Sequence, residues 1–292
     1  MHQYLTAIGF GCIKSRKALN DILSYVENTF TQHELVSIDE DTAYCEFKRE
    51  FAEGIGISLV GNIDIDDSFK KEFYIPYFAG SGITTYADVL IERRIDKEAY
   101  VGICEDMKIG ISLIFHIQNS AAYLKKYWET DFTETFTSVT LSGLCNEGMI
   151  LLPVMKDKSQ EKQQKEDVRN RMMLLNAAKT GDPVAIENLT LDDIDIYSKV
   201  SRRLVTEDVF SIVDTYIMPY GVECDRYSIL GMITAVRKTR NEITEEEIYI
   251  MGLDVNDLTF DICVPVNHVV GEPAVGRRFK GNIWMQGYVN FE

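Results

Sequence analysis

Two apolar runs near the C-terminus, separated by a short polar turn, decide the fold. They are Glu247-Ile248-Tyr249-Ile250-Met251-Gly252-Leu253-Asp254 and Leu258-Thr259-Phe260-Asp261-Ile262-Cys263-Val264, with Asn256-Asp257 between them. β-Branched and aromatic residues in short runs are typical of strands, and Asn and Asp tolerate the backbone of a tight turn. The stretch therefore predicts two strands joined by a turn.

Further strand-like runs surround this pair. They are Tyr227 to Arg237, which contains Gly231, and Asn282 to Phe291. Several strands of even length with interior glycines favour a small closed barrel, and an OB-like barrel is one option. We therefore predict a β-rich, barrel-like domain over residues 206–292, whose strand order the sequence does not give.

The N-terminal half predicts an α+β sheet domain over residues 1–156. Ser15 is placed to cap a helix that begins at Arg16, with apolar residues at helical spacing as far as Phe30. Strand-like runs follow, and a short helix is predicted from Asn119 to Trp128. The runs are Ala43 to Phe51, Ile55 to Ile63, Lys71 to Phe78, Ala99 to Cys104, Lys108 to Gln118, Thr135 to Leu144 and Gly148 to Val154.

Residues 157–205 predict a helical connector. One helix carries apolar residues from Val168 to Ala178 and ends at Gly181, and Asp182-Pro183 begins a second. Thr190 is predicted to begin a third. Its apolar stripe consists of Leu191, Ile194, Tyr197, Val200 and Leu204. The whole chain is thus expected to be α+β, with a mixed N-terminal sheet, a helical connector and a small C-terminal barrel.

The composition of the chain limits the classes of protein to which it can belong. The 292 residues are 46% hydrophobic and carry a formal net charge of −16, which opposes binding to nucleic acid or to an anionic membrane. No run approaches the ~20 apolar residues of a membrane helix, and the first ten residues lack a secretory signal. The six cysteines are scattered singly, which argues against zinc pairs and disulfides. A soluble, cytoplasmic protein is expected.

The sequence lacks the common catalytic motifs. The sequence has no GxxxxGK[ST] phosphate loop and no GxSxG elbow, and its four histidines are not at metal-ligand spacing. We therefore predict no cofactor and no metal, and favour a protein that is not an enzyme.

A basic loop with aromatic neighbours is the most informative candidate site. Arg277, Arg278 and Lys280 give this region a local excess of positive charge in an acidic chain, and the aromatic Trp284 follows them. Arginines can fork onto a phosphate or carboxylate, and aromatic rings can stack on a ligand. We predict a site for an anionic small molecule or an acidic protein segment. The alternative is that the arginines pair with acids of the chain itself.

A second candidate is the polar cluster Glu223, Cys224 and Asp225. Two carboxylates beside a thiol could support acid/base chemistry, although neighbouring acids raise a thiol pKa and so disfavour the thiolate. The alternative is a turn whose cysteine packs inward. Two functions stay open: a non-catalytic binding or adaptor protein, and an enzyme with a cleft between the two β-rich parts. The oligomeric state is not predicted.

Three short stretches carry a resemblance to a known family. They are Ala7 to Phe10, Met218 to Asp225 and Gly271 to Gly281. Together they resemble an uncharacterised domain-of-unknown-function family from anaerobic Gram-positive bacteria, along the whole chain. The resemblance implies a bacterial cytoplasmic setting, and it carries no activity, cofactor or catalytic residue.

Overall fold

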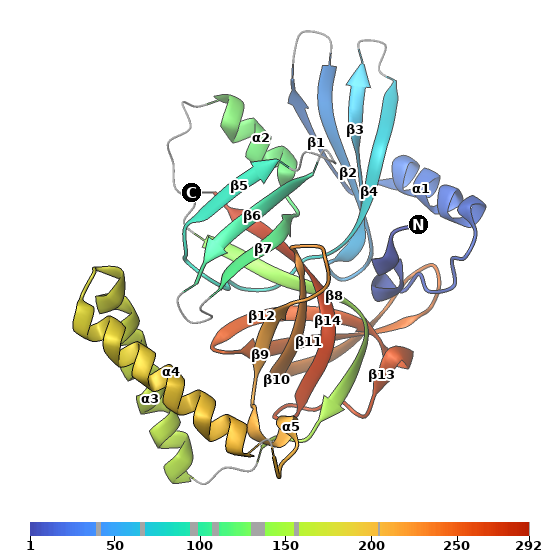
Figure 1. Ribbon diagram of the computed structural model, residues 1–292. Helices are drawn as coiled ribbons and strands as arrows, with labels where there is room; N and C mark the ends of the chain where they lie inside the picture. The colour runs from blue at the N-terminus through green and yellow to red at the C-terminus, as the bar shows by residue number, and fades with distance from the viewer. Residues whose placement is uncertain are drawn as a thin grey trace.

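The computed structural model describes residues 1–38, 42–64, 68–93, 99–106, 111–129, 138–154, 158–203 and 205–291. The fold is α+β, as predicted, and contains two β-sheets (Figure 1). One sheet has four strands. The other closes five of its strands into a barrel and extends beyond it. None of the described helices is long and apolar enough to cross a membrane.

The four-stranded sheet is an antiparallel meander near the N-terminus. Its strands pair in chain order: β1 (Gln32–Ser37), β2 (Thr42–Ala52), β3 (Ile55–Asp64) and β4 (Phe69–Phe78). Helix α1 (Arg16–Thr29) packs on it through a stripe that includes Leu19, Leu23 and Val26. The Ser15 hydroxyl accepts a hydrogen bond from the Ala18 amide at 3.1 Å, which confirms the predicted cap.

The barrel takes one strand from the middle of the chain. Its strands are β8 (Ser138–Leu151), β12 (Leu258–Pro265), β11 (Glu247–Val255), β10 (Arg226–Arg240) and β14 (Arg278–Asn290), in that order around the barrel. Strand β8 closes it by pairing parallel to β12 and antiparallel to β14. The barrel is therefore not built from residues 206–292 alone. The three-domain division stays a prediction, and its boundary at 156–157 lies outside the described residues.

Asn256 and Asp257 form the predicted turn between β11 and β12. Both have positive φ, 55° and 63°, the backbone of a type I′ hairpin turn. Shorter elements complete this sheet and its surroundings. They are β5 (Val89–Arg93), β6 (Tyr100–Glu105), β7 (Ser112–Ile117), β9 (Tyr216–Pro219), β13 (Val269–Val270), α2 (Ser120–Glu129), η1 (Gln3–Ile8) and η2 (Val266–His268).

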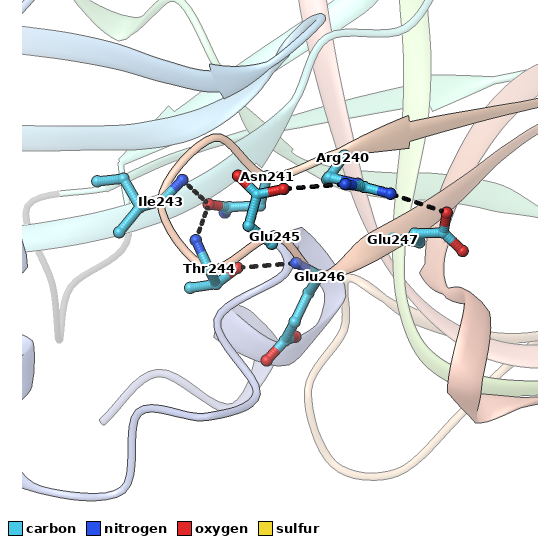
Figure 2. Close-up of polar contacts among 7 residues, drawn as sticks. All are labelled: Arg240, Asn241, Ile243, Thr244, Glu245, Glu246 and Glu247. Atoms are coloured by element: carbon cyan, nitrogen blue, oxygen red, sulfur yellow. Dashed lines mark hydrogen bonds and ion pairs between the residues drawn. The ribbon is translucent and has the colours of Figure 1, made fainter.

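Polar contacts within the loop between β10 and β11 hold its shape (Figure 2), and the loop fastens the N-terminal turn η1 to the barrel. The Asn241 side chain is fully buried. Its Oδ1 accepts from the amides of Ile243 and Thr244 at 3.0 and 3.1 Å, and its Nδ2 donates to the Ile8 carbonyl at 2.9 Å. Gly9 follows with φ +81°, and a Cβ there would lie 2.8 Å from the Asn241 Cβ. Only glycine fits this close approach without strain.

Two buried glutamines join the four-stranded sheet to the barrel. Gln118 Nε2 donates to Gln286 Oε1 at 2.8 Å and to the Phe78 carbonyl at 2.7 Å. Gln286 Nε2 donates to the Pro76 carbonyl at 2.9 Å. Because both side-chain amides donate to backbone carbonyls of β4, the network fixes how the two sheets meet.

The helical segment forms a two-helix hairpin. Helix α3 (Lys158–Lys179) ends before Gly181, which has φ +87°. Asp182 Oδ1 then accepts from the Val184 amide at 2.9 Å to begin α4 (Pro183–Arg203), as predicted. A short helix, α5 (Val209–Ile212), follows. Figure 1 shows α3 and α4 standing out from the barrel, and in the described part of the chain each packs extensively only on the other.

The prediction that a third helix begins at Thr190 is wrong, because α4 runs through this residue without a break. The Thr190 hydroxyl donates to the Ile186 carbonyl, four residues earlier, at 2.9 Å. This is the bond a threonine makes inside a helix, whereas a capping threonine would accept from an amide ahead of it.

Candidate functional site

Arg278, at the start of β14, is buried and its guanidinium is saturated by backbone carbonyls. Nε and Nη2 donate to the Leu152 carbonyl at 2.9 and 2.8 Å. Nη2 also donates to Phe210 at 2.7 Å, and Nη1 to Val213 at 2.7 Å. Burial lowers the pKa of Arg278. Because Leu152 precedes the hairpin and Phe210 and Val213 follow it, one side chain ties together both ends of the segment that forms the hairpin.

The other two basic residues lie close to this tie. Arg277 is half-buried and its Nη1 donates to the Glu272 carbonyl at 2.6 Å. The Lys280 ammonium lies over the Phe210 ring, 4.5 Å from its centroid, a cation–π geometry. The basic loop thus packs against α5, the first element after the hairpin. Binding of an anionic ligand by Arg277 and Lys280 stays a prediction, whereas the Arg278 donors are occupied by the fold.

Trp284 lies in a different cluster and is buried. Its Nε1 donates to Asp225 Oδ2 at 2.9 Å. His2, Tyr4 and His116 surround the indole, with ring centroids 4.7, 5.5 and 5.3 Å away. The structure therefore brings together one residue from each of the two predicted sites, and separates Trp284 from the arginines.

The three residues of the predicted polar cluster have different surroundings. Asp225 is buried against Trp284, Cys224 is exposed, and the Glu223 carboxylate lies 3.8 Å from the Arg226 guanidinium. Cys224 therefore does not pack inward. An enzyme with a cleft between the two β-rich parts stays a prediction. Among the described residues, no group of three or more His, Cys, Asp or Glu side chains could hold a metal ion.

The far side of α4, which faces away from α3, exposes several large apolar side chains. The inner side faces α3, where Ala185 is buried and Asp193 Oδ1 pairs with Arg171 Nη2 at 2.7 Å. With about 100° of rotation per residue, a set of apolar residues lies round the other half of the helix. It consists of Val184, Ile186, Leu191, Ile194 and Tyr197, whose exposed fractions run from 49% for Ile186 to 75% for Tyr197.

The sequence contained this signal, because Leu191, Ile194 and Tyr197 belong to the predicted apolar stripe. The sequence did not show whether this stripe is buried against another element or exposed. A helix with one apolar side buries it, whereas α4 is apolar on its inner and outer sides. α3 covers the inner side at Ala185 but leaves Ile196, on the same side, 51% exposed. The outer side of α4 is the strongest candidate functional surface in the described part of the chain.

Comparison with known proteins identifies a family and no activity. Residues 5–287 match the family described as "Domain of unknown function, E. rectale Gene description (DUF3881)". No curated protein and no solved structure matches the chain. The match confirms the predicted resemblance to a family of unknown function named for an anaerobic Gram-positive bacterium. Because the match covers nearly the whole chain, the protein belongs to this domain-of-unknown-function family.

Proposed function

We propose that the chain is a non-catalytic binding or adaptor protein that holds a helical segment of another polypeptide against the far side of α4. The observation that carries the proposal is the exposure of five apolar side chains on this side: Val184, Ile186, Leu191, Ile194 and Tyr197. Soluble proteins rarely expose contiguous apolar patches larger than a few hundred Å² unless the patch binds something.

The shape of the surface indicates what it binds. The apolar residues at 184, 191 and 194 are seven and three residues apart, so they lie on one face of α4, and Tyr197 follows three residues later. An exposed helical face of this kind packs best against an amphipathic helix with its own apolar stripe. Completing the burial of each half-exposed aliphatic side chain would contribute about 1 kcal/mol. The four aliphatic side chains and Tyr197 would together contribute about 5 kcal/mol.

The base of the hairpin supports the same proposal. The Arg278 guanidinium donates to carbonyls on both sides of the hairpin, at Leu152 and Phe210. A binding helix held in a fixed position loses less conformational entropy when its partner docks. This arrangement gives the sequence-predicted basic loop a role in presenting the hairpin.

We place this binding function in the cytoplasm. All six cysteines are free thiols in the structure, and four of them are buried. Unpaired thiols in such number fit a reducing compartment, where disulfides do not persist.

Photo-cross-linking in cells that express the full chain tests the proposal. A benzoylphenylalanine at position 197 should cross-link to another polypeptide, and Leu191→Asp in the same chain should abolish the product. The matched control is position 86, since Tyr86 and Tyr197 are 74% and 75% exposed. Absence of a product at position 197, or equal products at both positions, would overturn the proposal.

A further inference from the structure

We infer that the helical segment on the far side of α4 belongs to a second copy of this chain, whose α4 packs antiparallel about a two-fold axis at Ile194. The inference rests on the proposed function and names its partner. A two-fold interface must be complementary to itself, because the same patch supplies both sides. The pattern of residues along α4 meets this requirement.

The apolar residues of α4 are placed symmetrically before and after Ile194. In an antiparallel pair, a residue that precedes the axis by a given number of positions meets one that follows it by the same number. Leu191 lies three residues before Ile194 and Tyr197 three after. The arrangement therefore packs Ile194 on Ile194 of the second copy and Leu191 on Tyr197 of the second copy, with aliphatic against aliphatic and aliphatic against aromatic.

The charges on this face match as well. Glu187 lies seven residues before Ile194, and Arg202 lies eight after it; both are exposed. Antiparallel pairing brings each Glu187 opposite Arg202 of the second copy. The offset of one residue is about 1.5 Å along the axis, within the reach of an arginine. Parallel pairing would instead place Glu187 against Glu187.

These two charges are free for such a contact. In the described part of the chain, neither the Glu187 nor the Arg202 side chain forms an ion pair or a hydrogen bond. Two other charged residues of α4 already have partners. Asp193 pairs with Arg171 at 2.7 Å, and Arg203 pairs with Glu207 at 2.6 Å. Asp195 and Arg202 are turned about 100° and 80° from Ile194 to the same side of the helix, so both lie beside the central apolar residues.

The mass of the purified full chain gives the first test. Sedimentation equilibrium at about 100 µM should give twice the chain mass of 33.3 kDa, and Leu191→Asp should give a monomer with an unchanged melting temperature. Leu90→Asp is the matched control, because Leu90 is 59% and Leu191 56% exposed, and it should leave the dimer intact. A monomeric wild-type chain, or a dimer that survives Leu191→Asp, would overturn the inference.

Charge reversal tests the antiparallel register. Glu187→Arg alone faces arginine with arginine, and Arg202→Glu alone faces glutamate with glutamate, so each homodimer should weaken about ten-fold. In a mixture of the two variants, both pairs of a heterodimer are again opposite in sign. Wild-type dimerisation should therefore return in the mixture. If the mixture is no tighter than either variant alone, the register is wrong.

The outcomes separate this inference from the proposed function. A monomeric chain that still cross-links at position 197 to a different polypeptide would overturn the second copy as partner and support the binding function. A chain that neither dimerises nor cross-links there would overturn both.

Discussion

The Arg278 guanidinium donates two hydrogen bonds to the carbonyl oxygen of Leu152, from Nε at 2.9 Å and from Nη2 at 2.8 Å. The two residues are 126 positions apart, and between them the chain forms the whole hairpin and most of the barrel. The contact fixes where the projecting helices leave the barrel, so the stability of the fold and the presentation of α4 depend on the same side chain.

Replacing Arg278 by Met should lower the free energy of unfolding by about 3 kcal/mol, because the carbonyls of Leu152, Phe210 and Val213 would lose their buried donor. Urea denaturation measures the change. Arg277→Met is the control, since Arg277 makes one backbone hydrogen bond, to Glu272, and is half-buried. It should cost less than about 1 kcal/mol. Equal costs for the two variants would contradict the role given to Arg278.

Replacing Gly9 by Ala should destabilise the joint between η1 and the barrel. Alanine at positive φ costs about 1–2 kcal/mol, and its Cβ would also press on Asn241, 2.8 Å away. Gly276→Ala isolates the first effect, because Gly276 has φ +85° and nothing within 4 Å of the added Cβ. The thermal midpoint should fall further for Gly9→Ala than for Gly276→Ala, and the reverse order would refute this account of the joint.

Replacing Asp225 by Ala should destabilise the cluster round Trp284, because the buried indole N–H would lose its acceptor. The expected cost is about 1–3 kcal/mol. Asp225→Asn retains an acceptor oxygen and should cost less. Fluorescence of Trp284, recorded in a Trp128→Phe background to remove the other tryptophan, reports the change directly. A Trp284 spectrum that is the same in Asp225→Ala as in the parent chain would show that the hydrogen bond does not hold the indole.

The thiols should differ in reactivity, since the thiolate is the reacting form. Burial raises the pKa of Cys45, Cys104 and Cys145 to about 12, so these thiols should resist Ellman's reagent until the protein unfolds. Cys224 is exposed and should react first.

Cys12 gives a finer test of the same rule. Its pKa is raised by burial and by the Glu246 carboxylate, which also accepts from the Gly11 and Cys12 amides. Glu246→Gln removes the negative charge and should therefore speed the labelling of Cys12 at about pH 8. An unchanged rate would mean that the carboxylate does not control this thiol.

Local sequence signals predicted much of the secondary structure. Ser15 begins α1, Gly181 and Asp182 separate the two helices, and Asn256-Asp257 turns the chain between β11 and β12, because each depends on one or two residues and their own backbone. Strand pairing depends on contacts between distant segments. The closure of the barrel by β8, which pairs with β12 and β14 more than a hundred residues later, has no local signal.

The candidate sites show the same division. A basic loop beside aromatic residues is typical of ligand binding, but nothing local shows that Arg278 is buried beneath carbonyls from two distant segments. Thr190 fits both a cap and a helix interior, and only the continuous α4 decides between them. The apolar stripe of α4 was visible in the sequence, whereas its exposure follows from the lack of a second covering element in the described part of the chain.

The most direct test of the central claim is hydroxyl-radical footprinting of the full chain in its native cells. Tyr197 and Tyr86 are 75% and 74% exposed in the isolated chain, so without a partner they should be oxidised equally. If another polypeptide covers the far side of α4, Tyr197 should be oxidised several-fold less than Tyr86, and Leu191→Asp should restore equality. Equal oxidation of the two tyrosines in the wild-type chain would contradict the claim.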